Sequence, residues 1–245
     1  MVRQRRWIWW PPLDIAAMIR IALQTHKGRN MASELTTVEF QHALVLQAWQ
    51  CLIGDARITY VSGPITTGLR WIEALESGSN PDGPVINANC DTIRRAARKL
   101  RRETRELVLE PASLHVESWS QDDYLALWTT LIERHAAAVA FVEDWPYSIG
   151  CALEFERAVT HKVVARTLEA EPISRADGTA LIRQAAEDVM ARSATASRAA
   201  TLAERLAAVA LRLETTGRGD AQQIGIRAAS RPKRAASSPS PRSGG

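Results

Sequence analysis

The fold is decided by the stretch Trp145-Pro-Tyr-Ser-Ile-Gly-Cys-Ala-Leu-Glu-Phe-Glu-Arg-Ala158. An apolar run precedes it at residues 136–142 and predicts a buried strand, and the stretch itself predicts a helix over residues 148–160. Ser148 stands at the N-cap position of this helix, and Gly150 allows close approach to its first turn. A buried strand that leads directly into a helix is typical of an open α/β sheet.

One face of this predicted helix is apolar, and a carboxylate borders it. Counting 100° per residue, the apolar stripe consists of Cys151, Phe155, Ala158 and Val159. Glu154 falls beside Ala158 rather than on the opposite face. Open α/β sheets bind ligands beyond the carboxyl ends of their strands, and this carboxylate follows such an end. The sequence therefore predicts an active-site glutamate at position 154.

Strands and helices alternate along the middle of the chain. The residue patterns predict strands at residues 58–62, 106–109, 137–142 and 162–165. They predict helices at residues 36–52, 89–104, 121–134 and 148–160, the first capped by Thr36 or Thr37 and the second by Asn89 or Asp91. This alternation indicates an α/β fold, a Rossmann-like three-layer domain with a parallel sheet of about four to five strands. Helical extensions are expected at both ends.

Composition divides the chain into four segments. Residues 1–30 are basic and rich in Trp. This composition indicates an arm that contacts a membrane surface or nucleic acid, or else a segment upstream of a true start at Met31. We favour the start at Met31. Residues 31–190 form the α/β domain, and residues 191–216 form a C-terminal helical extension. Residues 217–245 are rich in Gly, Ser, Pro, Arg and Ala and are expected to be disordered.

The C-terminal extension carries a short apolar seam. Its members recur at spacings of 4, 3 and 4, and they are Leu202, Leu206, Val209 and Leu213. This spacing is typical of a coiled coil, but barely two heptads are present. Packing against the chain's own domain and dimerisation are therefore equally favoured.

Charge is distributed unevenly. Residues 1–30 and 218–245 each carry six basic side chains and one acidic one, so the segment between them is net negative although the whole chain is +4. The predicted helix at 89–104 and its C-terminal flank are also basic, which could bind a phosphate backbone, but a solvated helix face explains the same pattern and is favoured. Nucleic-acid binding is consequently the last-ranked function.

Cysteine usage and hydropathy exclude several classes of protein. Cys51, Cys90 and Cys151 are widely spaced and have no His at ligand spacing, which argues against a disulfide framework and a structural zinc site. A reducing, cytoplasmic setting is expected. No run reaches the ~18–20 apolar residues of a membrane span.

Three motifs resemble the nucleoside deoxyribosyltransferase superfamily, and they follow one another along the chain in the same order as in that superfamily. Trp145-x-x-Ser-x-Gly-x-x-x-Glu154 resembles a poorly characterised branch of it, in which a Trp stands three residues before the Ser. Ile58-Thr-Tyr-Val-Ser-Gly-Pro-Ile-Thr-Thr-Gly68 resembles the first strand and the Tyr-x-x-Gly-Pro loop of that superfamily. Leu107-Val-Leu-Glu-Pro-Ala112 resembles the strand that precedes its Asp-bearing segment. The resemblance covers roughly residues 57 to 190.

The resemblance implies cleavage of an N-glycosidic bond in a nucleoside or nucleotide. Glu154 matches the nucleophile, and either water or a second base accepts the sugar, which makes the protein an N-hydrolase or a deoxyribosyltransferase. A second carboxylate would assist the departing base. The Asp-bearing segment matches the doublet Asp122 and Asp123; we favour Asp123, and helix N-capping is an equally good explanation for it.

Further residues are expected to bind the substrate, and they are Tyr60, Gly63, Pro64, Thr66, Asp122, Trp145, Ser148 and Gly150. The loop at 63–68 and the helix start at Ser148 offer backbone N–H groups to a sugar or a phosphate. The resemblance implies that Tyr60 lines the sugar pocket, and Trp145 could stack on a base, although a core or rim position explains either aromatic equally well. The loop is not a dinucleotide or Walker motif, so no cofactor is expected, and no metal site is visible.

The chain departs from the family at two places, and two other functions compete with an enzyme. The strand at residues 162–168 ends without the small polar run of some members. Many members carry an Asp at the start of the strand before the glutamate helix, and residues 133–138 contain none. A homo-oligomer is implied by the resemblance alone. The alternative to an enzyme is a nucleotide-binding sensor or interaction module without turnover, and a nucleic-acid binder ranks third.

Overall fold

The structure is a computed structural model that describes residues 37–54, 56–104, 106–192 and 197–229, with side chains described as far as Thr216. The predictions for residues 1–30 therefore lie outside the described residues. Across these ranges, no helix combines the length and apolar character that a membrane crossing requires.

Four parallel strands form one sheet. They are β1 (Ile58–Ser62), β2 (Leu107–Leu109), β3 (Ala136–Phe141) and β4 (Val164–Thr167), in the order β2-β1-β3-β4. The chain runs outward from β1 to β2 and then returns past β1 to β3 and β4. The order therefore reverses between β1 and β3, and the carboxyl ends of these two strands form the topological switch point. The expected parallel α/β sheet is confirmed.

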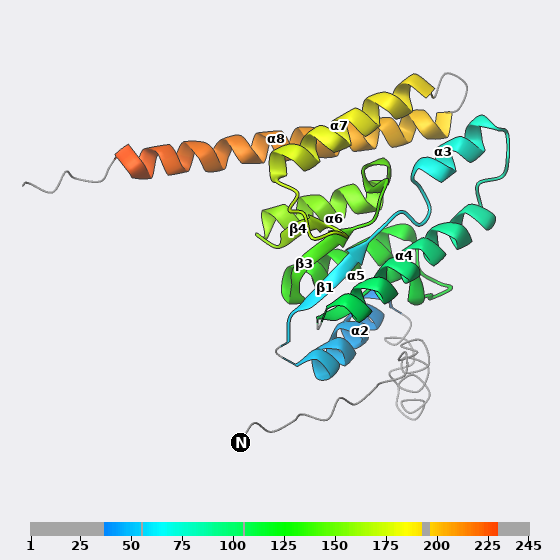
Figure 1. Ribbon diagram of the computed structural model, residues 1–245, viewed down its shortest axis with the longest axis horizontal. Helices are drawn as coiled ribbons and strands as arrows, with labels where there is room; N and C mark the ends of the chain where they lie inside the picture. Colours follow the sequence, from blue (N-terminus) through cyan, green and yellow to red (C-terminus); the bar gives the residue numbers. More distant parts are fainter. Residues whose placement is uncertain (1–36, 55, 105, 193–196, 230–245) are drawn as a thin grey trace, which may run out of the picture.

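Helices cover both faces of the sheet, as Figure 1 shows. α4 (Pro84–Glu103) follows β1, whereas α5 (Gln121–His135) and α6 (Ile149–Thr160) precede and follow β3. Right-handed crossovers that run in opposite directions from β1 place their helices on opposite faces. The alternation of β1 agrees, since Tyr60 packs in the larger core cluster with α5 and α6 while Val61 packs with α4. These layers confirm a Rossmann-like domain.

The remaining long helices pack outside this domain core. α2 (Val38–Ile53) packs on α5, and Thr37 caps it as predicted by accepting a hydrogen bond from the backbone N–H of Phe40. α7 (Arg175–Arg192) and α8 (Ser197–Ala229) lie side by side and pack against α6 (Figure 1). α8 extends past the predicted helical extension into the segment 217–245.

The apolar seam of α8 lies in the domain core. All four side chains are buried in the larger core cluster, and they are Leu202, Leu206, Val209 and Leu213. Of the two explanations for the seam, packing against the chain's own domain is the one observed. The seam is not available to a second copy of the chain.

The largest boundary difference from the sequence predictions is at the start of α4. α4 begins at Pro84, not at Asn89 or Asp91, because Pro is compatible with the first helical turn and Gly83 precedes it as the N-cap. The first turn of α4 was not predicted because Pro and Gly residues, which are typical of loops, surround its start. β4 begins at Val164, two residues later than predicted, and α3 (Leu69–Glu76) was not predicted.

The basic helix α4 presents a solvated face, as favoured from the sequence. Ile93, Ala97 and Leu100 are buried beneath it. Arg94 and Arg101 donate hydrogen bonds to backbone carbonyls of this same domain, at residues 112 and 108. Part of the positive charge of α4 therefore stabilises β2 and the turn at residues 111–113 that follows it.

Candidate active site at the switch point

A buried carboxylate lies at the carboxyl end of β1. Only 6% of Glu154 is exposed, and both of its oxygens accept hydrogen bonds. Tyr60 Oη donates to Oε1 over 2.7 Å, and Ser62 Oγ donates to Oε2 over 2.5 Å. Tyr60 and Ser62 point to the same face because they are two residues apart on one strand. α6 follows β3 directly, which brings Glu154 to this face beside the switch point.

Burial controls the protonation of this site. It raises the pKa of Glu154 to about 7, although the hydrogen bonds from Ser62 and Tyr60 act in the opposite direction. Burial and then the nearby Glu154 raise the pKa of Tyr60 well above its usual value, so this phenol keeps its proton and remains a donor. A carboxylate with such a pKa is close to half ionised at neutral pH, which suits a nucleophile or a base.

The neighbouring thiol does not compete as a nucleophile. Cys151 lies one helical turn before Glu154 and is buried. Burial, followed by the charge of Glu154, raises the pKa of Cys151 to about 12. The thiolate is therefore absent at neutral pH, in agreement with the burial expected from its place on the apolar stripe.

Three hydrogen bonds hold the loop at residues 63–68, which follows β1. Thr67 Oγ1 donates to Ser148 Oγ and Thr66 Oγ1 donates to Gln121 Oε1, each over 3.2 Å. Asn89 Nδ2 donates to the carbonyl of Ile65 over 3.0 Å. The loop is thus bound to the starts of α6 and α5 and to α4. Ser148 occupies the N-cap position of α6 as predicted, but its hydroxyl makes no capping hydrogen bond.

The glycines of this region have different roles. A Cβ atom on Gly63 would lie 2.7 Å from Ile93 Cγ1 and 3.1 Å from Val142 Cγ2, so this glycine allows the end of β1 to pack against α4. A Cβ atom on Gly150 would meet only Ser148 Oγ, at 3.8 Å. The space beside Gly150 is therefore not filled by any other part of the chain that the structure describes.

Trp145 is a core residue. Only 5% of it is exposed, and its ring centroid lies 4.5 Å from that of Phe141 and 5.1 Å from that of Phe155. Of the two roles weighed for Trp145, the structure shows the packing role. Stacking on a base would require this side chain to leave the core.

The predicted Asp doublet lies at the start of α5. Asp123 accepts hydrogen bonds from the backbone N–H and the hydroxyl of Ser120, both over 2.7 Å, and completes a capping box. These hydrogen bonds lower the pKa of Asp123. Asp122 is exposed. Capping is thus the observed role of Asp123, and neither carboxylate forms a hydrogen bond with Glu154.

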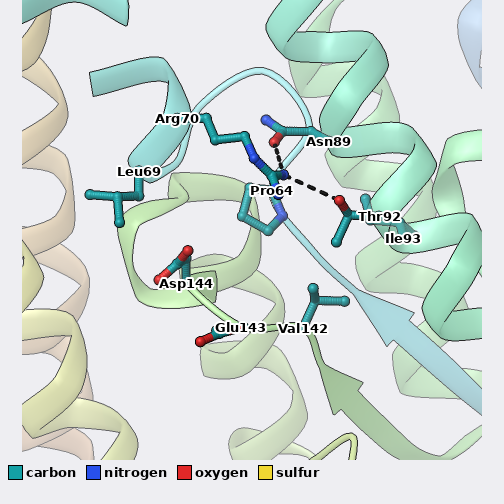
Figure 2. Close-up of a pocket in the computed structure, with 9 residues that line it drawn as sticks. All are labelled: Pro64, Leu69, Arg70, Asn89, Thr92, Ile93, Val142, Glu143 and Asp144. Atoms are coloured by element: carbon teal, nitrogen blue, oxygen red, sulfur yellow. Dashed lines mark hydrogen bonds between the residues drawn. The ribbon is translucent and has the colours of Figure 1, made fainter. Parts of the chain in front are cut away.

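A small cavity opens beside the ends of β1 and β3. Its volume is about 60 Å³, and it is lined by Pro64, Leu69, Arg70, Asn89, Thr92, Ile93, Val142, Glu143 and Asp144 (Figure 2). Of the residues predicted from sequence, only Pro64 lines it. Glu143 and Asp144 directly follow β3, so their position after a strand end could have identified them. Arg70 and Asn89 carried no such signal. Glu154 does not line this cavity.

The composition of the site does not favour a metal ion. In the part of the chain that the structure describes, no three His, Cys, Asp or Glu side chains are grouped to hold one.

Comparison of the chain with profiles of known families, with curated proteins and with solved structures finds no match. The fold and the site define a parallel α/β protein with a buried carboxylate at its switch point.

We expect Thr67→Val to loosen the loop at residues 63–68. The substitution removes the hydrogen bond to Ser148, which contributes about 1 kcal/mol, so amide exchange in the loop should accelerate about fivefold while global stability changes little. Hydrogen exchange read by mass spectrometry measures this. Thr130→Val, which removes a hydrogen bond within α5, is the matched control. Equal exchange of the loop in both variants would contradict the proposed role of Thr67.

Proposed function

We propose that this protein cleaves the N-glycosidic bond of a nucleoside or nucleotide, as an N-hydrolase or a deoxyribosyltransferase, with Glu154 as the nucleophile. The observation that carries the proposal is the buried Glu154 carboxylate at the switch point, held by the hydroxyls of Tyr60 and Ser62. Two fixed donors orient the carboxylate, and although burial raises its pKa to about 7, part of it remains ionised at neutral pH.

The proposed reaction has two steps. The ionised carboxylate of Glu154 attacks the anomeric carbon, the bond from that carbon to the base nitrogen breaks, and the base leaves with the bonding electrons and takes up a proton. Water or a second base then attacks the same carbon, loses a proton and displaces the carboxylate. Water gives a free sugar and therefore hydrolysis, whereas a second base gives transfer.

A second acid is needed for the departing base. The family resemblance implies Asp123, but the hydrogen bonds from Ser120 favour its ionised form, which has no proton to give. Water is therefore the proposed source of the proton for the departing base.

A nucleotide-binding module without turnover is the second candidate. It is favoured by the low exposure of Glu154, 6%, and by the three hydrogen bonds that hold the loop at residues 63–68 in place. In this function Glu154 would fix β1 to α6, and the loop would close on a ligand. Binding without base release distinguishes this function from the enzyme.

The pH dependence of the reaction follows from Glu154. Because the attacking form is ionised, kcat/KM should rise with pH and level off above about 7. Ser62→Ala removes a hydrogen bond that lowers the pKa of Glu154, so the inflection should move upward by about one unit. Initial rates between pH 5 and 9 measure both profiles. An inflection that stays in place in Ser62→Ala would contradict the assignment.

Base release tests the proposed function directly. The full chain is incubated with ribonucleosides, deoxyribonucleosides and their 5′-monophosphates, with and without a second free base, and the products are separated by chromatography. Release of free base supports hydrolysis, and appearance of a new nucleoside supports transfer. Absence of both, with a ligand that raises the melting temperature, would move the assignment to the binding module.

A further inference from the structure

We propose that the cavity beside Arg70 binds hydroxyl groups of the substrate sugar and selects nucleosides over their 5′-monophosphates. This inference rests on the proposed function, since it names the substrate class of the same switch point. The cavity, about 60 Å³ in volume, has room for a few water molecules or a pair of hydroxyl groups but not for a nucleobase. It therefore suits one small polar part of a larger ligand.

The donor side of the cavity is fixed in place. Arg70 Nη1 donates to Asn89 Oδ1 over 2.9 Å and to Thr92 Oγ1 over 3.2 Å, as Figure 2 shows. Asn89 is 4% exposed and is itself held by its hydrogen bond to the carbonyl of Ile65. The guanidinium is thus oriented by a buried amide. A guanidinium carries five N–H donors, so further donors remain for a ligand oxygen.

The acceptor side consists of two carboxylates. Glu143 and Asp144 lie across the cavity from Arg70 in Figure 2, and both residues are exposed. Asp144 has a φ of 63°, in the left-handed region that Asp adopts more readily than most residues. Backbone hydrogen bonds from Trp145 to Val142 and from Tyr147 to Asp144 close this turn. The turn therefore presents two carboxylates at a defined place after β3.

This arrangement recognises hydroxyl groups better than phosphate. A hydroxyl group donates to a carboxylate and accepts from a guanidinium at the same time. A phosphate group only accepts, so it would gain from Arg70 and be repelled by both Glu143 and Asp144. With one cation and two anions, the cavity carries a net charge of −1, which disfavours a dianion.

The cavity and Glu154 flank the same strand end. Ser62, which donates to Glu154, is two residues before Pro64, which lines the cavity, and two residues span at most about 7 Å. Gly63 lies between them and packs against Ile93 and Val142 of the cavity wall. A sugar that lies across the carboxyl end of β1 would therefore present its anomeric carbon to one side and its hydroxyl groups to the other.

Binding to a variant that lacks the nucleophile tests this selectivity separately from catalysis. Calorimetry with the full-length Glu154→Gln variant, in the presence of a chelator, compares the affinity of each nucleoside with that of its 5′-monophosphate. We expect the nucleoside to bind at least tenfold more tightly than its monophosphate. Adding Glu143→Gln and Asp144→Asn should reduce that ratio to below about threefold, and Arg70→Met should weaken nucleoside binding about tenfold. Asn is well tolerated in the left-handed region, and melting curves verify folding of every variant.

The control removes two other exposed carboxylates, with Glu171→Gln and Glu187→Gln, and should leave the ratio unchanged. Tighter binding of the monophosphate, an unchanged ratio in the Glu143 and Asp144 variant, or no binding of any nucleoside would each overturn the subsite. If no base is released in the earlier assay but the expected ratios are found, only the enzymatic step has failed. Failure of the ratios with base release intact would instead remove the subsite alone.

Discussion

Glu154→Gln should abolish base release and, at the same time, stabilise the protein above neutral pH. Glutamine keeps the shape of the side chain but cannot attack the anomeric carbon, so kcat should fall by at least about a thousandfold. Stability should rise because burying an ionised carboxylate is costly, even with hydrogen bonds from Tyr60 and Ser62. A residue that lowers stability and is retained for its chemistry is typical of active sites.

The sign and size of the stability effect follow from the pKa of Glu154. Folding raises this pKa from 4.5 to about 7, so the folded state binds the proton more tightly than the unfolded state. The wild type therefore has its full stability below pH 4.5 and loses about 3 kcal/mol as the pH rises through 7. Glutamine does not titrate, so the free energy of unfolding of the variant increases relative to that of the wild type over this same pH range.

Urea unfolding at pH 4, 5.5 and 8 measures the difference. The free energy of unfolding of Glu154→Gln relative to wild type should increase by about 3 kcal/mol between the first and the last of these pH values. Glu156→Gln on the same helix removes a surface ion pair with Arg212 and should change stability by less than about 1 kcal/mol. A difference that is constant with pH would contradict the burial of an ionisable carboxylate.

Gly178→Ala should be the most destabilising small substitution in the domain. Gly178 is a buried glycine in α7, and a Cβ atom there would lie 2.0 Å from Phe155 Cζ and 2.4 Å from its Cε1. The Phe155 ring is fully buried and packs against the rings of Phe141 and Trp145, so it has no free space in which to move. Overpacking of this kind costs about 1–3 kcal/mol, and we expect a value at or above the upper end of this range.

Gly150→Ala provides the matched control. It also adds one methyl group to a helical glycine, but nothing in the described part of the chain lies within 3.4 Å of the new atom. Since alanine favours helix, the variant should be as stable as wild type or up to about 1 kcal/mol more stable. Thermal and urea unfolding compare the two variants. Equal effects of Gly178→Ala and Gly150→Ala would show that α7 does not pack on Phe155 as described.

The sequence predicted those features that depend on local pattern. Buried parallel strands are continuous apolar runs, so the run at β3 was visible, and Glu154 on the border of an apolar stripe marked the site. Tyr60 was placed at the site from the family resemblance. Ser62 was not, although it stands two residues beyond Tyr60 on the same face of β1.

Arg70 and Asn89 could not be predicted as cavity residues because they meet only in the folded chain. Arg70 and Asn89 are separated by the turn-rich stretch at residues 77–84, and the start of α4 was placed too late. Asn89 was therefore interpreted as a cap, whereas it lies in the second turn of α4 and orients Arg70. Glu143 and Asp144 reach the same cavity from β3, far along the chain. Periodicity carries no information on such contacts.

The central claim is that the carboxylate of Glu154 cleaves an N-glycosidic bond. The most direct test measures base release by wild type, Glu154→Gln and Glu156→Gln side by side, at pH 8, on the nucleoside that the wild type prefers. We expect wild type and Glu156→Gln to release base at similar rates and Glu154→Gln to release it at least about a thousandfold more slowly. Comparable release by folded Glu154→Gln would contradict the claim.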